Sequence, residues 1–485
     1  MKSYKGKKVA VLGAAIEGMA VAKFLVKQGA KVTICDKKND IEVVSKCDFD
    51  TECRLGEGYL DNLTDFEAIF RSPGVRLLLP EIQAAKHAGV EISSQIKLFF
   101  DLCPARIIGV TGTKGKGTTA TLIYEILKKN IRSPQGHSPL RDDYKKARHC
   151  EGELGELAAI PSVYIAGNIG TPAIEVIGKL KPNDIVILEL SSFQLQDLEK
   201  SPHIAVVLNV TQDHLDYHKD RDEYVEAKIP ITKFQAPNDY AVINEDYETS
   251  RSFQKSTRAQ AYGFSRKGQV KRGCFVRDGK IIWKDEDQEI TIANTADLTL
   301  RGKHNWENIC AAACASILAG AEPKIIGKTI AEFPGLEHRL EFVAEVGGVK
   351  YYNDSFSTTP ETAIAAIKAF DEPKIIILGG SEKGSDYTEL GKTVAESNVK
   401  AVCLIGEMAE RIANAIQNSK FKIQNSKFKI IKGCKNMKEI IKASRSAASR
   451  GDVILLSPAC ASFDMFKNYK ERGEQFKQEV KSLRA

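Results

Sequence analysis

The stretch GVTGTKGKGTT, residues 109–119, joins an apolar run (105–108) to an amphipathic stretch (120–127). This order predicts a strand, a glycine-rich loop and a helix. Glycines let a backbone wrap a phosphate, the helix start offers amide hydrogens, Lys116 adds a full positive charge, and a threonine hydroxyl can bind Mg²⁺. The match to GxxxxGK[ST] is imperfect, because Val110 replaces the first glycine and Gly117 follows the lysine. The stretch still predicts a nucleoside-triphosphate loop formed by Gly112, Thr113, Lys114, Gly115, Lys116, Gly117, Thr118 and Thr119.

Three apolar runs after this loop each end in polar side chains, which are Asn168, Glu189 and the pair Asp213-His214. The carboxyl ends of parallel strands meet at one crevice, so we expect these groups to gather near Lys116. A carboxylate opposite a phosphate loop can hold Mg²⁺, and we assign this role to Glu189, with His214 in contact with metal or substrate. By itself, Lys228 in EYVEAKIPI is an ordinary helix lysine.

The first 36 residues predict a nucleotide-binding βαβ unit, with KVAVL (8–12), the turn GAAIEG (13–18) and KVTICD (31–36). The turn is a degenerate GxGxxG, so either a dinucleotide coenzyme or another phosphate-bearing ligand fits, as does an empty turn. Ser72-Pro73-Gly74 follows the short strand 67–70 and could offer free amides to a phosphate or be an ordinary turn.

Strands and helices alternate again from about residue 335, with NDS (353–355), LGG (378–380) and SPACAS (457–462) after strand ends. The expected fold class is α/β with three domains. A Rossmann-like domain spans 1–102 and a central P-loop ATPase-type parallel-sheet domain spans 103–334, with an insertion near 131–155. A Rossmann-like C-terminal domain spans 335–485, with a repeat insertion at 416–429.

Length and composition indicate a globular protein of several domains. The chain has 485 residues, 43% apolar and 27% charged, which fits two to four globular domains and excludes wholesale disorder. Its eleven cysteines form no CxxC pair, and no run of 18 apolar residues or signal-peptide pattern occurs. We therefore expect a reduced, cytoplasmic enzyme with no membrane partner.

The net charge of +7 does not predict nucleic-acid binding. Residues 131–150 contribute +3, and the tandem IQNSKFK duplication at 416–429 contributes +4. The rest of the chain is neutral, so a basic surface spread over the fold is not expected. Both segments are interpreted as inserted surface loops without fixed order.

The motifs TGTKGKGTT, GNIG, ELSSFQL, NVTQDHLDYH, the Ala227-Lys228 pair, HNWEN, EHRLE, NDS and LGG occur in an order that resembles the Mur ligase family of peptidoglycan synthesis. The stretch SPACASFDMFKNYKERGEQF (457–476) is most similar to the branch that adds D-glutamate to UDP-N-acetylmuramoyl-L-alanine. The resemblance covers nearly the whole chain apart from the two insertions and favours the phosphate-ligand interpretation of GAAIEG over a dinucleotide. It implies a monomeric ATP- and Mg²⁺-dependent amide ligase with small-molecule substrates and an acyl-phosphate intermediate.

The resemblance also implies residue roles. The catalytic groups would be Lys116, His214 and Lys228, and the metal ligands Thr118, Glu189, His214 and Lys228, the last as a carbamate. The phosphate loop, Asn308, Arg339 and Asp354 would bind ATP. Ser72 and Gly74 would bind the uridine diphosphate, Asn168 the muramoyl part, and Thr358, Lys383, Ser462, Phe463 and Tyr469 the amino acid.

This chain departs from the family pattern at three places. Lys114 and Gly117 alter the phosphate loop, Phe356 stands where NDSK has lysine, and Lys37-Lys38 replace a Thr-Arg pair near the uridine end. We hypothesise that Lys114 or Lys383 compensates for the cation missing at Phe356. The loop also resembles folylpolyglutamate synthase, which stays an alternative, as does another Mur-type ligase with a different substrate. A non-catalytic Mur-like amidotransferase subunit is disfavoured because no cysteine quartet is present.

Overall fold

The computed structural model describes residues 3–39, 49, 51–132, 161–211, 217–382, 384–420 and 428–483. The chain forms two compact units, Met1–Ala296 with Trp306–Ile330, and Asp297–Asn305 with Ala331–Ala485. Residues 133–160 and 421–427, which hold most of the first predicted insertion and half of the second, lie outside the described residues, as do His214 and Lys383.

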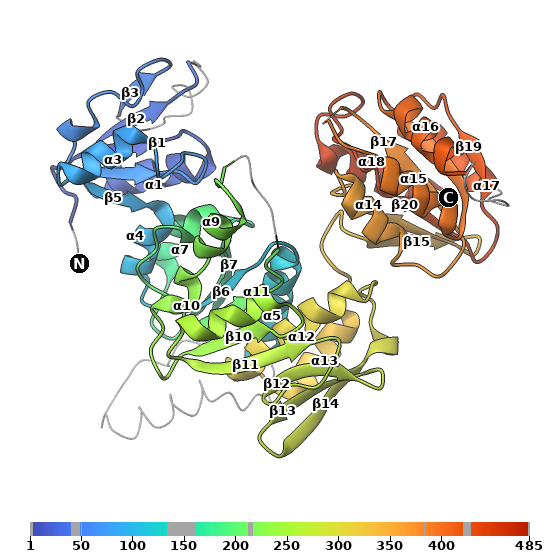
Figure 1. Cartoon of the computed structure of the whole chain (residues 1–485), viewed down its shortest axis with the longest axis horizontal. Coiled ribbons are helices and arrows are strands. Elements are labelled where there is room, and N and C mark those ends of the chain that lie inside the picture. The colour runs from blue at the N-terminus through green and yellow to red at the C-terminus, as the bar shows by residue number, and fades with distance from the viewer. Residues whose placement is uncertain are drawn as a thin grey trace. The chain divides into compact units, whose positions relative to one another are not determined.

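The first sheet of unit 1 is fully parallel and has the strand order β3-β2-β1-β4-β5. One sheet face packs on α1 and α4, and the opposite face packs on α3 (Figure 1). Alternate residues of each strand enter these two cores, which makes the doubly wound arrangement predicted for this domain. The elements are β1 (Lys8–Leu12), α1 (Ile16–Lys27), β2 (Lys31–Asp36), β3 (Glu52–Leu55), β4 (Ala68–Arg71), α3 (Pro80–His87), β5 (Glu91–Ser94) and α4 (Gln95–Leu102).

The second sheet of unit 1 has the order β14-β13-β12-β11-β10-β9-β6-β8-β7. From β7 across the sheet to β12, every neighbouring pair of strands is parallel. The strands β13 and β14 form a hairpin that extends the sheet beyond β12, and the β12–β13 and β13–β14 pairs are antiparallel. Central β6 leads directly into α5, as the phosphate-loop stretch predicts. The strands are β6 (Arg106–Thr111), β7 (Val163–Gly167), β8 (Ile185–Glu189), β9 (Ile204–Val207), β10 (Tyr240–Asn244), β11 (Gln260–Ser265), β12 (Gly273–Arg277), β13 (Lys280–Asp285) and β14 (Gln288–Asn294).

The helices associated with this sheet are short except for α5 and the two that follow β14. They are α5 (Lys116–Arg132), α7 (Ala173–Val176), α8 (Ser192–Leu195), α9 (Arg221–Glu226), α10 (Pro230–Lys233), α11 (Glu248–Arg251), α12 (His304–Leu318) and α13 (Pro323–Glu332). Lys228 lies in the turn between α9 and α10 rather than within a helix, which corrects the sequence-based interpretation. Pro230 has no amide hydrogen, so α9 cannot continue through it.

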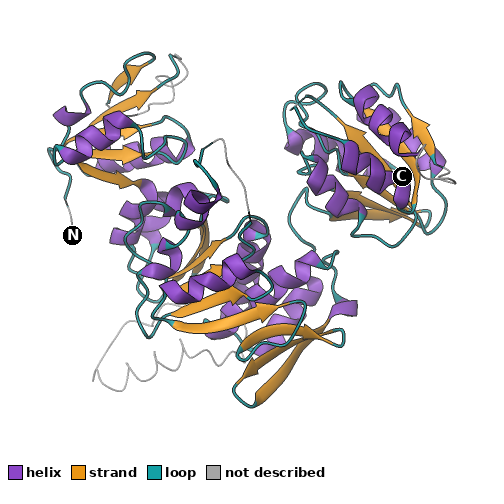
Figure 2. Ribbon diagram, viewed as in Figure 1, coloured by secondary structure: helices purple, strands orange, loops and turns teal. Residues whose placement is uncertain are grey.

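Unit 2 contains a six-stranded sheet in the order β15-β16-β20-β17-β18-β19, parallel except for the β15–β16 pair. One face packs on α14, α15 and α16, and the other on α17 and α18, so the strands lie between two helical layers (Figure 2). The elements are β15 (Glu341–Val346), β16 (Val349–Asn353), α14 (Pro360–Ile367), β17 (Lys374–Gly379), α15 (Thr388–Glu396), β18 (Val399–Ile405), α16 (Ala409–Lys420), β19 (Lys429–Ile431), α17 (Met437–Ala447), β20 (Val453–Leu456) and α18 (Tyr469–Ser482).

Three separate sheets with helices around them confirm the three-domain α/β fold class. Among the helices in the described part of the chain, none combines the length and apolar character that crossing a bilayer requires. The described cysteines are all free thiols.

Candidate functional site

The phosphate loop connects β6 to α5 and is shaped by glycine. Gly115 has φ +88°, and a Cβ atom there would overlap the side chain of Asn308 from α12. A residue with a side chain would therefore be strained and would also displace Asn308. Thr119 Oγ1 lies 3.4 Å from Asn308 Oδ1, so the loop and the predicted nucleotide residue Asn308 are packed together.

The ammonium of Lys116 folds back over this loop. Its Nζ donates to the carbonyl oxygens of Gly112 at 3.0 Å and Thr113 at 3.1 Å. The chain after β9 fixes the other side of the loop, since Thr113 N donates to Asn209 O at 2.7 Å and Lys114 N donates to Asn209 Oδ1 at 3.1 Å. A full positive charge is thus held at the loop that leads into α5, which suits an anionic phosphate chain.

Glu189 ends β8 as a buried carboxylate. Asn168 Nδ2 donates to Glu189 Oε1 at 2.9 Å, and the Asn168 amide donates to Glu189 O at 3.0 Å. These contacts confirm that two of the polar groups after neighbouring strands come together. Asp213 and His214, predicted for the same crevice, lie outside the described residues.

Lys228 is also buried close to the phosphate loop. Its Nζ lies 3.4 Å from both Thr111 Oγ1 and Gly112 O, and 4.6 Å from the centre of the Tyr224 ring. The Tyr224 hydroxyl lies 3.1 Å from Thr113 Oγ1. Gly112 O therefore accepts from both Lys116 and Lys228, which brings the two predicted catalytic lysines to one segment of backbone.

The donor set of this region fits Mg²⁺. The ion prefers oxygen ligands. The buried Glu189 carboxylate and the buried hydroxyl of Thr118 at the start of α5 provide such oxygens. Elsewhere in the described residues, Glu337, His338 and Glu474 lie close enough to share an ion. There the ammonium of Lys477 already binds Glu337 at 2.7 Å and Glu474 at 2.6 Å, and it takes the place of a metal.

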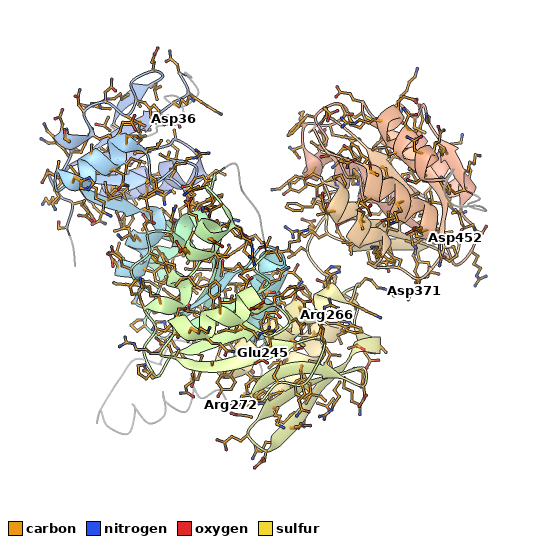
Figure 3. All side chains as sticks on the ribbon, viewed as in Figure 1. Asp36, Glu245, Arg266, Arg272, Asp371 and Asp452 are labelled. Carbon is orange, nitrogen blue, oxygen red and sulfur yellow. The ribbon has the colours of Figure 1, made fainter. Side chains whose placement is uncertain are left out.

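A cavity of about 750 Å³ in unit 1 joins the two predicted ligand regions. The predicted site residues Ser72, Gly74, Lys116 and Asn168 all line it. Asp36, labelled in Figure 3, lines the same cavity and accepts from the Ala14 amide at 2.6 Å and the Lys38 amide at 2.8 Å. The turn after β1, the SPG turn and the phosphate loop therefore share one pocket.

Two residues of unit 1 had no role assigned from the sequence: Glu17, which lines this pocket, and Arg71, which lies next to its SPG turn. Arg71 is buried at the end of β4 and donates to Phe193 O at 2.9 Å, which ties the SPG turn to α8. Glu17 accepts from Gln194 Nε2 at 2.7 Å. A charged residue within the apolar run AIFR was the available signal for Arg71, whereas the Glu17–Gln194 contact spans 177 positions and leaves no local pattern.

In unit 2, the loop that presents Arg339 is held by residues after β16. Leu340 N donates to Asp354 Oδ1 at 3.1 Å, and Phe356 N donates to His338 O at 3.0 Å. Burial raises the pKa of Asp354 from 3.8 to about 7, although Ser457 Oγ donates to its Oδ2 at 2.7 Å. Hydrogen bonds thus join the loop that carries Arg339 to the loop that carries Asp354, and both residues are predicted to bind the nucleotide.

The predicted amino-acid residues of unit 2 lie on two connected segments. Ser462 is buried and Phe463 is 72% exposed in the loop after β20, and Phe463 N donates to Ser381 Oγ at 3.1 Å. Tyr469 begins α18, and its carbonyl accepts from Ser355 Oγ at 2.7 Å. Thr358 is partly buried just before α14.

Arg472 lies within the stretch SPACASFDMFKNYKERGEQF, and the sequence predicts no role for it. This fully buried guanidinium donates to Ser355 O at 2.9 Å, Cys460 O at 3.2 Å and Ala461 O at 3.2 Å. Burial lowers its pKa to about 10. Arg472 therefore fixes the loops after β16 and β20 to each other.

Models of three families match separate parts of the chain. The Mur ligase MurD-like N-terminal domain matches residues 7–94, the Mur ligase middle domain matches residues 110–316, and the Mur ligase glutamate ligase domain matches residues 338–460.

Full-length relatives carry the same assignment. The UDP-N-acetylmuramoylalanine--D-glutamate ligase of Acetivibrio thermocellus is 40% identical over 100% of this chain and 98% of its own length. The protein of that name from Symbiobacterium thermophilum is 39% identical over 98% of both chains. Among solved structures, MurF ligase from Thermotoga maritima in complex with ADP has a TM-score of 0.56 at 19% identity and covers 100% of this chain and 97% of its own, which shows the shared fold. The chain belongs to the Mur ligase family.

Proposed function

We propose that this protein is an ATP-dependent, ADP-forming ligase that adds D-glutamate to UDP-N-acetylmuramoyl-L-alanine in peptidoglycan precursor synthesis. The observation that carries the proposal is the shared pocket of unit 1. Lys116 of the phosphate loop and Asn168 line the same cavity as Ser72 and Gly74 of the N-terminal turns. A nucleotide substrate anchored at those turns would reach the phosphate loop. Full-length relatives named for this reaction support the choice of substrates.

The first chemical step joins two anions. A carboxylate oxygen of the alanyl group attacks the γ-phosphorus of ATP, and the bond from that phosphorus to the β,γ-bridging oxygen breaks to release ADP. Lys116 offsets the repulsion between the carboxylate and the triphosphate, because its ammonium lies over the loop that would hold the phosphates. The product is an acyl phosphate.

In the second step, the amine of D-glutamate attacks the acyl carbon. The tetrahedral intermediate expels inorganic phosphate, the amine loses a proton, and the amide forms. We assign the amino acid to Thr358, Lys383, Ser462, Phe463 and Tyr469, and the adenine nucleotide to Asn308, Arg339, Asp354 and the phosphate loop.

We propose that Thr118, Glu189, His214 and a carbamylated Lys228 hold Mg²⁺, which would neutralise phosphate charge when bound. The uridine diphosphate is assigned to Ser72 and Gly74, and the muramoyl part to Asn168. We further infer domain boundaries at 102/103 and 334/335, and a monomeric protein acting in the cytoplasm.

The test measures phosphate release from ATP with Mg²⁺ and UDP-N-acetylmuramoyl-L-alanine, with D-glutamate, L-glutamate or no amino acid. We expect release with D-glutamate alone. The K116A variant should lose at least about 100-fold in kcat, since it removes transition-state charge stabilisation. Release with L-glutamate, or with a folate acceptor in place of the muramoyl substrate, would overturn the substrate assignment.

A further inference from the structure

The first turn of α1 carries a carboxyl group that faces into the unit 1 pocket. Glu17 is the second residue of this helix, and it lines the cavity together with Ser72, Gly74 and Lys116. The N-cap residue Ala15 makes no side-chain cap hydrogen bond, and Ala15, Ile16 and Glu17 all line the cavity, so the start of the helix lies at its wall. A helix start attracts anions, and a carboxylate in its first turn uses the same favourable potential.

Glu17 is held in this position by α8, the short helix that follows Glu189. Gln194 Nε2 donates to Glu17 Oε1 at 2.7 Å. The amide is itself oriented, because Gln194 Oε1 accepts from Ser191 N at 2.9 Å and from Ser191 Oγ at 3.1 Å. This capping box turns the nitrogen of the side chain toward Glu17. Turning Glu17 out of the pocket would break the contact.

The helix can approach the SPG turn closely because Gly18 follows Glu17. A Cβ atom at position 18 would overlap Gly13 O and would meet Ser72 Oγ. Ser72 Oγ donates to Gly13 O at 3.0 Å and closes the turn beside the helix start. The carboxyl group is therefore fixed where the two turns proposed for the diphosphate converge.

We propose that Glu17 sets the nucleotide affinity of the uridine diphosphate pocket, where its carboxylate competes with the substrate phosphates for the start of α1. This inference rests on the proposed function. Two negative groups in one partly buried pocket repel, so the ionised side chain weakens nucleotide binding and the protonated side chain permits it.

The pH range in which this competition acts follows from burial. Burial raises the pKa of Glu17 from 4.5 to about 7, against the lowering effects of Gln194 and Arg71. The other charged residues that line the pocket are Asp36, Lys37, Arg76 and Lys116. Glu17 is therefore mostly protonated at pH 6 and ionised at pH 8, and nucleotide affinity falls as pH rises through this range.

The test uses calorimetric dissociation constants of UDP-N-acetylmuramoyl-L-alanine with the full chain at pH 6, 7 and 8. We expect wild-type affinity to fall roughly three- to tenfold from pH 6 to pH 8, because the ionised Glu17 carboxylate repels the substrate phosphates and solvent screens this repulsion only weakly. The E17Q variant keeps an amide that can bond Gln194, and it should bind at pH 8 about as well as wild type does at pH 6. The matched control is E81Q, which changes an exposed glutamate in the first turn of α3 and should retain the wild-type profile.

The outcomes separate the two proposals. Equal pH profiles for wild type and E17Q in a chain that still ligates D-glutamate would overturn the role of Glu17 alone. Weaker binding by E17Q at pH 8 would also overturn it. Failure of the wild-type chain to bind the nucleotide at any pH would overturn this inference and the proposed function together. A wild-type affinity that does not fall from pH 6 to pH 8 would overturn the role of Glu17 whether or not E17Q folds.

Discussion

The guanidinium carbon of Arg339 lies 3.9 Å from the centre of the Phe356 ring. The same ring meets Tyr469 edge-to-face at 5.0 Å. The position where the family pattern has lysine is thus occupied by an aromatic surface that supports a cation from the neighbouring loop. The hypothesis that Lys114 or Lys383 replaces the missing charge stays a prediction, and Lys383 lies outside the described residues.

This stack predicts a defect in ATP binding when the ring is removed. A cation–π contact at a partly exposed site contributes about 0.5–1 kcal/mol, so F356L should raise the KM for ATP roughly two- to fivefold. F356Y or F356W should restore it, because both keep an aromatic face. Steady-state kinetics with varied ATP measures the effect.

The control for this series is F342L, which removes another partly exposed ring of unit 2 that packs on Tyr352 at 5.4 Å. It should leave the KM for ATP unchanged. Equal ATP affinity in F356L and wild type would show that Phe356 does not position Arg339.

Much of the crevice in unit 1 was predictable because local patterns determine it. Strand ends in a parallel sheet converge, which placed Asn168 beside Glu189, and the phosphate-loop stretch placed Lys116 at a helix start. The turn at Lys228 depends on where α9 ends, and helix ends are poorly determined by local pattern.

Contacts between distant segments could not be predicted from the sequence. The hydrogen bond between Glu17 and Gln194 joins α1 to α8. The hydrogen bonds from Arg472 to the carbonyl oxygens of Ser355 and Cys460 join two loops that are also far apart in the chain. The antiparallel β13–β14 hairpin also extends a sheet that the sequence indicated only as parallel. Such features follow from the assembled fold and leave no periodicity in a single segment.

We predict that the free energy of unfolding of unit 2 depends on pH through Asp354. Its carboxyl pKa is raised by burial to about 7, so the folded state binds the proton more tightly than the unfolded state does. The stabilising contribution is present below the unfolded pKa near 3.8 and is lost as pH rises through about 7. D354N should flatten this dependence and stabilise unit 2 at pH 8 by roughly 1–3 kcal/mol, while weakening ATP binding.

Urea unfolding of the full chain, followed at pH 5 and pH 8, measures this effect. D452N is the comparison variant, because the Asp452 carboxylate pairs with Lys400 at 2.6 Å and accepts from Ser449 N at 2.7 Å (Figure 3). D452N should destabilise the protein, since it leaves a charge partner unpaired. A destabilised D354N at pH 8 would contradict the prediction.

We predict that the amine of Lys228 is carbamylated. Its buried Nζ lies 3.4 Å from Thr111 Oγ1, and a carbamate there would exchange a buried cation for an anion able to support a metal. In ¹³C-bicarbonate, a carbamate resonance should appear in wild type and be missing from K228R. K233R, which changes a lysine of the following helix, should retain the resonance. Identical spectra for wild type and K228R would exclude the modification at this residue.

We predict that Glu189 determines how much Mg²⁺ the enzyme requires for activity. E189Q keeps a group that can bond Asn168 but removes the charge, so half-maximal activity should require roughly tenfold or more Mg²⁺. Titration of phosphate release with Mg²⁺ measures this shift. The E175Q variant alters an exposed glutamate of α7 and should titrate like wild type. An unchanged Mg²⁺ requirement in E189Q would place the ion elsewhere.

Ligation through an acyl phosphate can be followed by mass spectrometry of both products formed from UDP-N-acetylmuramoyl-L-alanine labelled with ¹⁸O in its carboxylate. With ATP, Mg²⁺ and D-glutamate, the nucleotide product should gain one glutamyl residue, and the released phosphate should carry one ¹⁸O atom. A nucleotide of unchanged mass would exclude the ligation, and phosphate without the label would exclude the acyl phosphate.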